Sequence, residues 1–134
     1  MDLLNKEITD KIIKAYYKVY NSLGYGFLER VYENALFIEL TNMGLASEKQ
    51  RPIDVFYKGI KVGNYFADII VEGKVILELK AVEGIVEEHE FQLVNYLKAT
   101  EIEVGLLLNF GKVPEFKRKI FTNNIKSVKP AQSV

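Results

Sequence analysis

One stretch of the sequence, "ADIIVEGKVILELKA" from Ala67 to Ala81, constrains the fold more than any other. It consists of two short apolar runs separated by Glu72-Gly73, which predicts two antiparallel strands joined by a tight turn at the centre of a sheet. Asp68 interrupts the first run, and Glu78 and Lys80 interrupt the second. Because a buried charged group is costly unless it is paired or bound to a metal, these three residues need an explanation.

Two helices are predicted before this hairpin. Apolar residues recur at helical spacing over residues 5–23, which end before Gly24, and again from about Leu28 to Met43, before Gly44. The residues that we expect on the buried face of the second helix are Leu28, Val31, Tyr32, Ala35 and Leu36.

The hydrophobic period then changes to alternation. The segments "PIDVFYKG", "IKVGNYFADIIVEG" and "KVILELKAV" predict three antiparallel strands joined by short turns. Helical spacing returns in "VEEHEFQLVNYLKAT", through Phe91, Val94 and Leu97, and the apolar run "EVGLLLNFG" predicts a buried strand. The basic segment "FKRKIF" predicts either a short helix or an edge strand. We therefore expect a single α/β domain over residues 1–134, with a mixed four-stranded sheet flanked by helices.

Composition excludes several classes of site. The 134 residues include no cysteine, which rules out disulfides, thiolate metal sites and cysteine nucleophiles and favours the cytoplasm as location. No apolar run approaches the roughly 20 residues of a membrane span, so we expect no membrane association. The formal net charge is zero, but the segment with Lys112, Lys117, Arg118 and Lys119 is locally basic and can contact phosphates, or can simply be solvated.

The carboxylates of the hairpin predict a metal site. Asp68 has apolar neighbours, Phe66 and Ile70, on its own strand face, and the turn near Gly73 places residue 68 across from about residue 78. Two neighbouring carboxylates repel each other unless a positive charge lies between them. Lys80 can supply that charge, and a divalent ion such as Mg²⁺ would do so better while polarising a phosphoryl oxygen and lowering the pKa of bound water. The alternative is that Glu78 and Lys80 lie on an ordinary solvated strand face.

The pattern of Asp68 followed by Glu78-Leu79-Lys80 resembles the signature of the PD-(D/E)XK nucleases. More specifically, "LGYGFLERVYENAL", "ADIIVEGKVILELKAV", "HEFQLVNYLKAT" and "GLLLNFG" resemble the GxxExxxR proteins, a family placed in that superfamily. The resemblance implies a three-layer αβα sandwich, with an αβββαβ restriction-endonuclease-like core preceded by an extra N-terminal helix. The arginine that gives the family its name is replaced here by Glu33, so its role cannot be transferred.

The resemblance also implies roles for individual residues. Asp68, Glu78 and the backbone carbonyl of Leu79 would bind Mg²⁺ or Mn²⁺, Lys80 would orient or activate water, and Glu29 and Gln92 would support the site. His89, Tyr96, Lys112, Lys117, Arg118 and Lys119 would contact nucleic acid. The implied activity is hydrolysis of phosphodiester bonds by a metal-activated water, with DNA expected rather than RNA, and with a homodimer if both strands of a duplex are cut.

Each of these residues also has a plainer interpretation. Glu29 can serve only to favour the helix dipole, and His89, Gln92 and Tyr96 can form an ordinary polar helix face. At the level of the whole chain, the alternatives to a nuclease are a catalytically inactive module of the same fold that binds nucleic acid or protein, and a structural oligomerisation domain. The last would carry an exposed apolar patch and no pocket at Asp68.

Overall fold

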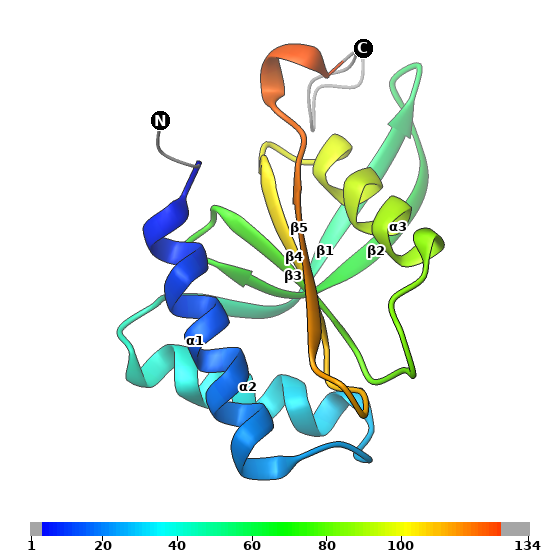
Figure 1. Ribbon diagram of the computed structural model, residues 1–134. Coiled ribbons are helices and arrows are strands. Elements are labelled where there is room, and N and C mark those ends of the chain that lie inside the picture. The colour runs from blue at the N-terminus through cyan, green and yellow to red at the C-terminus, as the bar shows by residue number, and fades with distance from the viewer. Residues whose placement is uncertain (1–3, 127–134) are drawn as a thin grey trace.

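The computed structural model describes residues 4–126, which form a five-stranded sheet between two layers of helices (Figure 1). In chain order the elements are α1 (Lys6–Leu23), α2 (Glu29–Asn42), β1 (Ser47–Tyr57), β2 (Ile60–Val71), β3 (Val75–Lys80), α3 (Glu87–Lys98), β4 (Val104–Asn109), β5 (Glu115–Ile120) and the short 3₁₀ helix η1 (Asn123–Ile125). This order confirms the predicted αβββαβ core with an additional N-terminal helix.

The strands lie in the sheet in the order in which they occur in the chain, β1-β2-β3-β4-β5. Only β3 and β4 are parallel, because α3 connects them, and every other neighbouring pair is antiparallel. The predicted mixed sheet is therefore present, and β5 extends it to five strands. Of the two structures predicted for "FKRKIF", the edge strand is correct.

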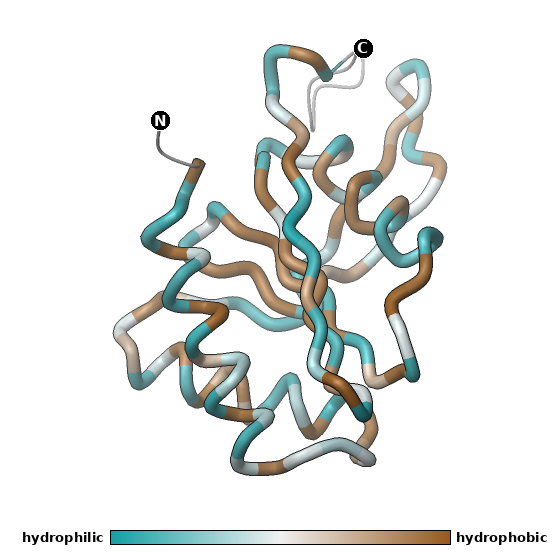
Figure 2. The backbone as a smooth tube through the Cα atoms, in the orientation of Figure 1, coloured by the Kyte–Doolittle hydropathy of each residue, from teal (hydrophilic) through white to brown (hydrophobic). Residues whose placement is uncertain are grey.

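Two hydrophobic clusters cover the two faces of the sheet. On one face Val75, Leu77 and Leu79 of β3 pack under α1 and α2, and on the other face Ile76 packs under α3. The central strands are accordingly the most apolar part of the backbone (Figure 2). Any charged residue on the α3 side of β3 is thus held between the sheet and a helix.

The helices bury a narrower face than the periodicity predicts. In α2 the fully buried residues are Tyr32, Leu36 and Leu40, one per turn, whereas Leu28 and Val31 are exposed, so their predicted burial is wrong. In α3, Phe91 has the same helical spacing as Leu97 but is exposed, whereas Leu93, Tyr96 and Leu97 face the sheet. Leu28 is the residue before the first turn of α2, and its side chain is exposed there.

Strands β1 and β2 form a long hairpin whose outer half extends beyond the rest of the sheet (Figure 1). We call residues 51–67 of this hairpin the arm. Its register shifts between Val55 and Phe56, and its turn at Lys58-Gly59 has positive φ at both residues, as in tight hairpin turns. Most residues of the arm are exposed, and Ile53 and Ala67 at its base join the core beside α3.

Buried hydrogen bonds fix the segments at the carboxyl end of β3 and β4. The hydroxyl of Tyr16 in α1 donates to the carbonyl of Asn109 and accepts from the backbone N–H of Glu115 at 2.9 Å. The side chain of Asn109 both accepts from and donates to the backbone of Val82, at 3.0 and 2.9 Å. The loop that follows Lys80 is therefore held against β4. No helix within residues 4–126 has the length and apolarity needed to cross a membrane.

Candidate active site

Asp68 and Glu78 meet where the pairing of β2 with β3 ends. The backbone ladder runs from Val71–Val75 to Ile69–Leu77, and its next step would pair residue 68 with residue 78. There the side chains replace the backbone partners: Glu78 Oε2 accepts from the Asp68 N–H at 3.0 Å, and Asp68 Oδ2 accepts from the Leu79 N–H at 2.8 Å. Asp68 thus lies across the hairpin from Glu78, as predicted.

These two carboxyl groups lie in an environment that disfavours their charge. Glu78 is 5% exposed, so the solvated strand face considered as an alternative is wrong. Burial, together with a smaller contribution from the nearby carboxyl of Asp68, raises the pKa of Glu78 to about 8. Burial also raises the pKa of Asp68, although the Leu79 N–H opposes that shift. A bound cation would relieve the repulsion between the two groups.

Lys80 lies on the same face of β3 as Glu78, two residues further along. Its ammonium nitrogen is 3.5 Å from Gln92 Oε1 of α3, and none of the six ion pairs within residues 4–126 includes it. An ammonium group with no carboxylate within ion-pair distance keeps its donors available for a water molecule or a phosphate oxygen. Gln92 is therefore positioned to hold the lysine without neutralising it.

Glu29, at the first residue of α2, reaches the same end of β3. Its Oε2 accepts from the N–H of Ala81 at 3.3 Å, directly after Lys80. The first turn of α2 thus contacts the strand that carries Glu78 and Lys80. Together the five side chains come from α2, β2, β3 and α3, so the site depends on the whole αβα arrangement.

Sequence reasoning missed Gln50. In β1 this residue lies opposite Asp68, between the pairs Lys49–Ile69 and Arg51–Ala67, and its φ of 54° is in the left-handed region. Its amide donates to Glu33 Oε1 at 2.9 Å and approaches Asp68 Oδ1 at 3.4 Å. Burial raises the pKa of Glu33, and the charge of Asp68 adds to the shift. A lone glutamine in a polar strand gives no signal in one sequence, so this link could not have been foreseen.

The donor set fits a hard divalent cation but does not enclose one. Within residues 4–126 no group of three or more His, Cys, Asp or Glu side chains is arranged to hold a metal ion. Mg²⁺ is usually bound through one or two carboxylates, with waters and substrate phosphates as the remaining ligands. Two adjacent, desolvated carboxylates with oxygen donors only are consistent with that mode of binding.

The residues predicted to contact nucleic acid do not form one surface. His89 Nδ1 accepts from the Val86 N–H at 3.1 Å at the start of α3, and Tyr96 is buried, with a pKa that burial raises to about 12. Because β5 alternates, Lys117 and Lys119 lie on the α3 side and Arg118 lies on the α1 side.

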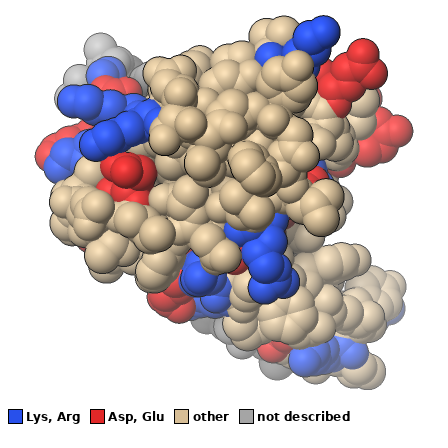
Figure 3. Space-filling view, turned by 90° about the horizontal axis from the view of Figure 1, so that it is seen from below, with Lys and Arg blue, Asp and Glu red and all other residues tan. Residues whose placement is uncertain are grey.

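The basic residues of β5 also differ in their partners. Lys119 pairs with Glu90 of α3 at 2.6 Å, and Arg118 donates to the carbonyl of Leu4 at 2.5 Å. Lys112 is exposed, and its carbonyl accepts from Tyr20. Seen from below, Lys and Arg side chains form separate groups rather than one continuous basic patch (Figure 3). Among the basic residues Lys112, Lys117, Arg118 and Lys119, the most exposed are Lys117 and Lys112, of which Lys112 precedes β5.

Comparison with known proteins shows which family the chain is related to. Neither the curated proteins nor the solved structures include a match to it. The family model of the PD-(D/E)XK nuclease superfamily matches residues 6–120, a range that runs from the first residue of α1 to the last residue of β5 and contains every residue of the candidate site. The resemblance to the GxxExxxR proteins within that superfamily stays a prediction. The chain belongs to the PD-(D/E)XK nuclease superfamily.

Proposed function

We propose that this protein is a nuclease that hydrolyses phosphodiester bonds of nucleic acid with the help of Mg²⁺ or Mn²⁺. The observation that supports this most is the pair of desolvated carboxyl groups, Asp68 and Glu78, beside the ammonium group of Lys80, which forms no ion pair with any residue of the range 4–126. A structural ion pair would instead bring Lys80 into contact with one of the two carboxylates. Carboxyl groups whose pKa is raised by burial, beside an ammonium group that does not pair with them, are typical of a site that awaits a ligand.

Asp68, Glu78 and the carbonyl of Leu79 would hold the divalent ion. When bound, such an ion supplies Lewis-acid stabilisation of the negative charge on a phosphoryl oxygen. The Leu79 N–H orients the Asp68 carboxylate, and the Asp68 N–H orients that of Glu78. Each carboxylate is therefore fixed by the other's strand before any ion binds, which reduces the reorganisation that binding requires.

Lys80 would act on water and phosphate. In hydrolysis a P–O bond to water forms, the P–O ester bond breaks, the water loses a proton and the departing oxygen gains one. An ammonium group beside the carboxylates can orient the attacking water and stabilise the charge that develops on the phosphate. Gln92 positions Lys80, and Glu29 positions the backbone that follows it.

Other parts of the proposal concern the substrate and its surroundings. Lys112 and Lys117 are exposed and would contact the phosphate backbone, with DNA expected rather than RNA. His89 in the first turn of α3 and Lys119 of β5, which pairs with Glu90 of α3, would assist. A single site cuts one strand, so a homodimer would be needed to cut both strands of a duplex. We place the protein in the cytoplasm on the basis of its lack of cysteine.

A metal-dependent cleavage assay tests this function. Labelled single-stranded, duplex and branched DNA and single-stranded RNA are incubated with MgCl₂, with MnCl₂ and with EDTA. We expect cleavage with either metal, none with EDTA, and a loss of about 100-fold or more in Asp68→Asn and Lys80→Ala. Lys74→Ala, an exposed lysine in the turn before β3, is the matched control and should retain full activity.

Two results would contradict the proposal. Cleavage that survives both substitutions would show that the activity lies elsewhere. Metal-independent binding of nucleic acid with no cleavage of any substrate would favour the inactive binding module, for which the replacement of the family arginine by Glu33 is the supporting observation.

A further inference from the structure

A pocket of roughly 290 Å³ lies between the arm and α3, next to the candidate active site. Residues from both elements line it: Val55, Tyr65, Glu88, Phe91, Gln92, Asn95 and Tyr96. This volume is at the lower end of the range for small-molecule sites, so it suits a single planar ring system rather than a larger ligand. The pocket exists because the arm extends past the edge of the sheet and turns one of its faces toward α3.

Aromatic rings form the apolar part of this pocket. Phe91 is 59% exposed and Tyr65 is 49% exposed, although both are large apolar residues that usually lie in a core. The ring of Tyr65 leans against the buried ring of Tyr96, with centroids 5.5 Å apart and an interplanar angle of 41°. The ring of Tyr65 therefore packs on the core on one side, while much of its surface stays available to a ligand.

The polar groups of the pocket exclude a phosphate and suit a heterocycle. Among the described residues that line it none is Lys or Arg, and the carboxylate of Glu88 would repel an anion. The amides of Gln92 and Asn95 offer both donors and acceptors, and Glu88 offers acceptors. These are the groups that pair with the hydrogen-bonding edges of nucleobases, and aromatic rings stack on their faces.

Gln92 connects this pocket to the catalytic centre. It lines the pocket and its Oε1 is also 3.5 Å from the Lys80 ammonium. A group bound in the pocket thus lies one side chain away from the lysine proposed to act at the scissile phosphate. A nucleotide can place its phosphate at Lys80 and its base in the pocket only if that base is not paired.

We propose that the pocket between the arm and α3 binds one unpaired base of the nucleic-acid substrate. This inference rests on the proposed function of the same site and names its substrate class: single strands, flaps or frayed ends. Phe91 and Tyr65 stack on the base, and Gln92 and Asn95 contact its edge. A fully paired duplex enters poorly, because a base would first have to leave its stack.

The test is a binding measurement in EDTA, so that cleavage does not interfere. Short single-stranded DNA and RNA oligonucleotides carry the fluorescent base 2-aminopurine, whose emission is quenched when it stacks on an aromatic ring. We expect quenching and tighter binding with single strands than with the same sequence in a duplex. Equal behaviour of the DNA and RNA strands would show that the base alone is recognised, and a difference would show that the sugar contributes.

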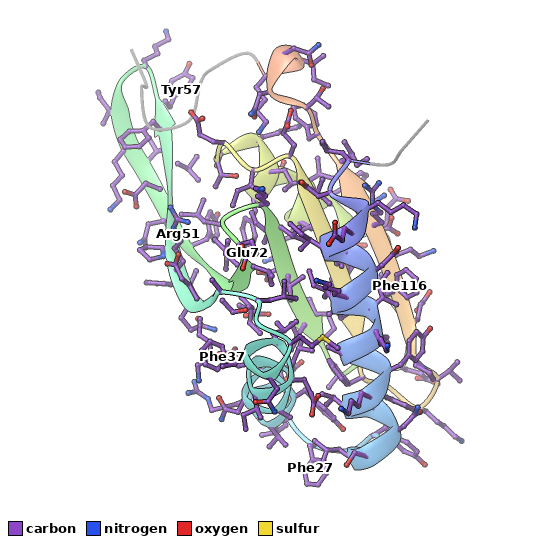
Figure 4. The ribbon with its side chains drawn as sticks, turned by 90° about the vertical axis from the view of Figure 1, so that its left-hand side faces the viewer. Phe27, Phe37, Arg51, Tyr57, Glu72 and Phe116 are labelled. Atoms are coloured by element: carbon purple, nitrogen blue, oxygen red, sulfur yellow. The ribbon has the colours of Figure 1, made fainter. Side chains whose placement is uncertain are left out.

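Variants at Phe91 separate stacking from simple apolar contact. Because Phe91 is exposed, Phe91→Leu and Phe91→Tyr should both fold, which a thermal melt confirms. Phe91→Leu should weaken single-strand binding about 10-fold and reduce the quenching to the part that Tyr65 contributes, whereas Phe91→Tyr should retain both. Tyr57→Ala is the matched control, because this exposed aromatic residue lies at the far end of the same arm, outside the pocket (Figure 4).

The inference and the nuclease proposal fail in different ways. If Phe91→Leu binds and quenches as the unaltered protein does, the pocket does not hold a base, whatever the cleavage assay gives. If single strands bind with Phe91-dependent quenching but no substrate is cut with Mg²⁺ or Mn²⁺, the pocket is correct and the nuclease proposal is wrong. Equal binding of single strand and duplex would overturn the inference as well.

Discussion

The backbone N–H of Asp68 donates to the side chain of Glu78, so the two carboxyl groups of the candidate site are linked across the β2–β3 hairpin. The link occurs at the first position where the two strands no longer pair through their backbones. Each side chain therefore has two roles, as a substitute for a strand partner and as a proposed metal ligand.

The first prediction concerns pH and the charge of Glu78. Its pKa is about 8 in the folded protein against 4.5 for an unperturbed group, so between these values the folded state binds more protons than the unfolded state. The free energy of unfolding of the metal-free protein should therefore fall as pH rises through this window. Urea denaturation from acidic to mildly alkaline pH in EDTA measures the slope, and MgCl₂ should reduce it.

Glu78→Gln is the variant that tests the cause of this slope. A glutamine keeps the acceptor for the Asp68 N–H but carries no charge, so near neutral pH the metal-free variant should be more stable than the unaltered protein, by on the order of 2 kcal/mol. It should also lose most of the stabilisation by Mg²⁺. An unchanged pH slope in Glu78→Gln would assign the slope to another group.

The second prediction concerns Gln50, which we expect to position Asp68 and Glu33. Gln50→Gly removes the amide but accepts the positive φ of 54° without strain, so the free energy of unfolding should stay within about 1 kcal/mol. The kcat of cleavage should fall about 10-fold, with little change in KM, because the carboxylates lose an orienting donor while the binding surface is intact. In Gln50→Asn the side-chain amide is one methylene shorter and should not reach Glu33 and Asp68. We therefore expect this variant to keep less than half of the activity of the unaltered protein.

The third prediction concerns Gly111, which follows β4. A Cβ at this position would overlap the backbone carbonyl of Val82, in the loop after Lys80, so Gly111→Ala should destabilise the fold by about 1–3 kcal/mol. Gly84→Ala is the control, since nothing lies within 4 Å of a Cβ there and its φ is not in the left-handed region. Chemical denaturation compares the two, and equal stabilities would show that the loop can move aside.

The fourth prediction concerns Tyr16, which connects α1 to the β4–β5 end of the sheet. Tyr16→Phe leaves the carbonyl of buried Asn109 and the N–H of Glu115 without this partner, which should cost about 1–3 kcal/mol. The neighbouring Tyr17, whose ring is partly exposed, gives the matched control Tyr17→Phe, and we expect no more than about 0.5 kcal/mol there. A similar loss in both variants would mean that the buried hydrogen bonds of the Tyr16 hydroxyl contribute no more to stability than the hydroxyl of Tyr17 does.

Several parts of the fold could be predicted because they depend on local patterns. The period of apolar residues predicts the type and order of the elements, and the turn at Glu72-Gly73 determines which residues of the hairpin face each other. The meeting of Asp68 and Glu78 follows from that count alone. Secondary structure and register are thus sufficient to place the carboxylates.

Other features depend on tertiary packing, which one sequence does not reveal. Phe91 and Leu28 have the spacing of buried residues, but which arc of a helix meets the core is decided by the layers around it. Three consecutive basic residues in "FKRKIF" interrupt the apolar alternation of a strand, so its pairing with β4 could not be read from the sequence. Gln50 and the arm pocket arise from contacts between segments that are remote in the chain.

The turn at Glu72-Gly73 has a consequence for the site that lies at the other end of the hairpin (Figure 4). Glu72 adopts a positive φ of 55°, and it is anchored to Ala46 by hydrogen bonds of 2.6 and 2.7 Å. Because side chains alternate between the faces of a strand, inserting or deleting one residue in this turn would rotate Asp68 and Glu78 to opposite faces. The length of an exposed turn therefore decides whether the two proposed metal ligands lie on one face of the sheet.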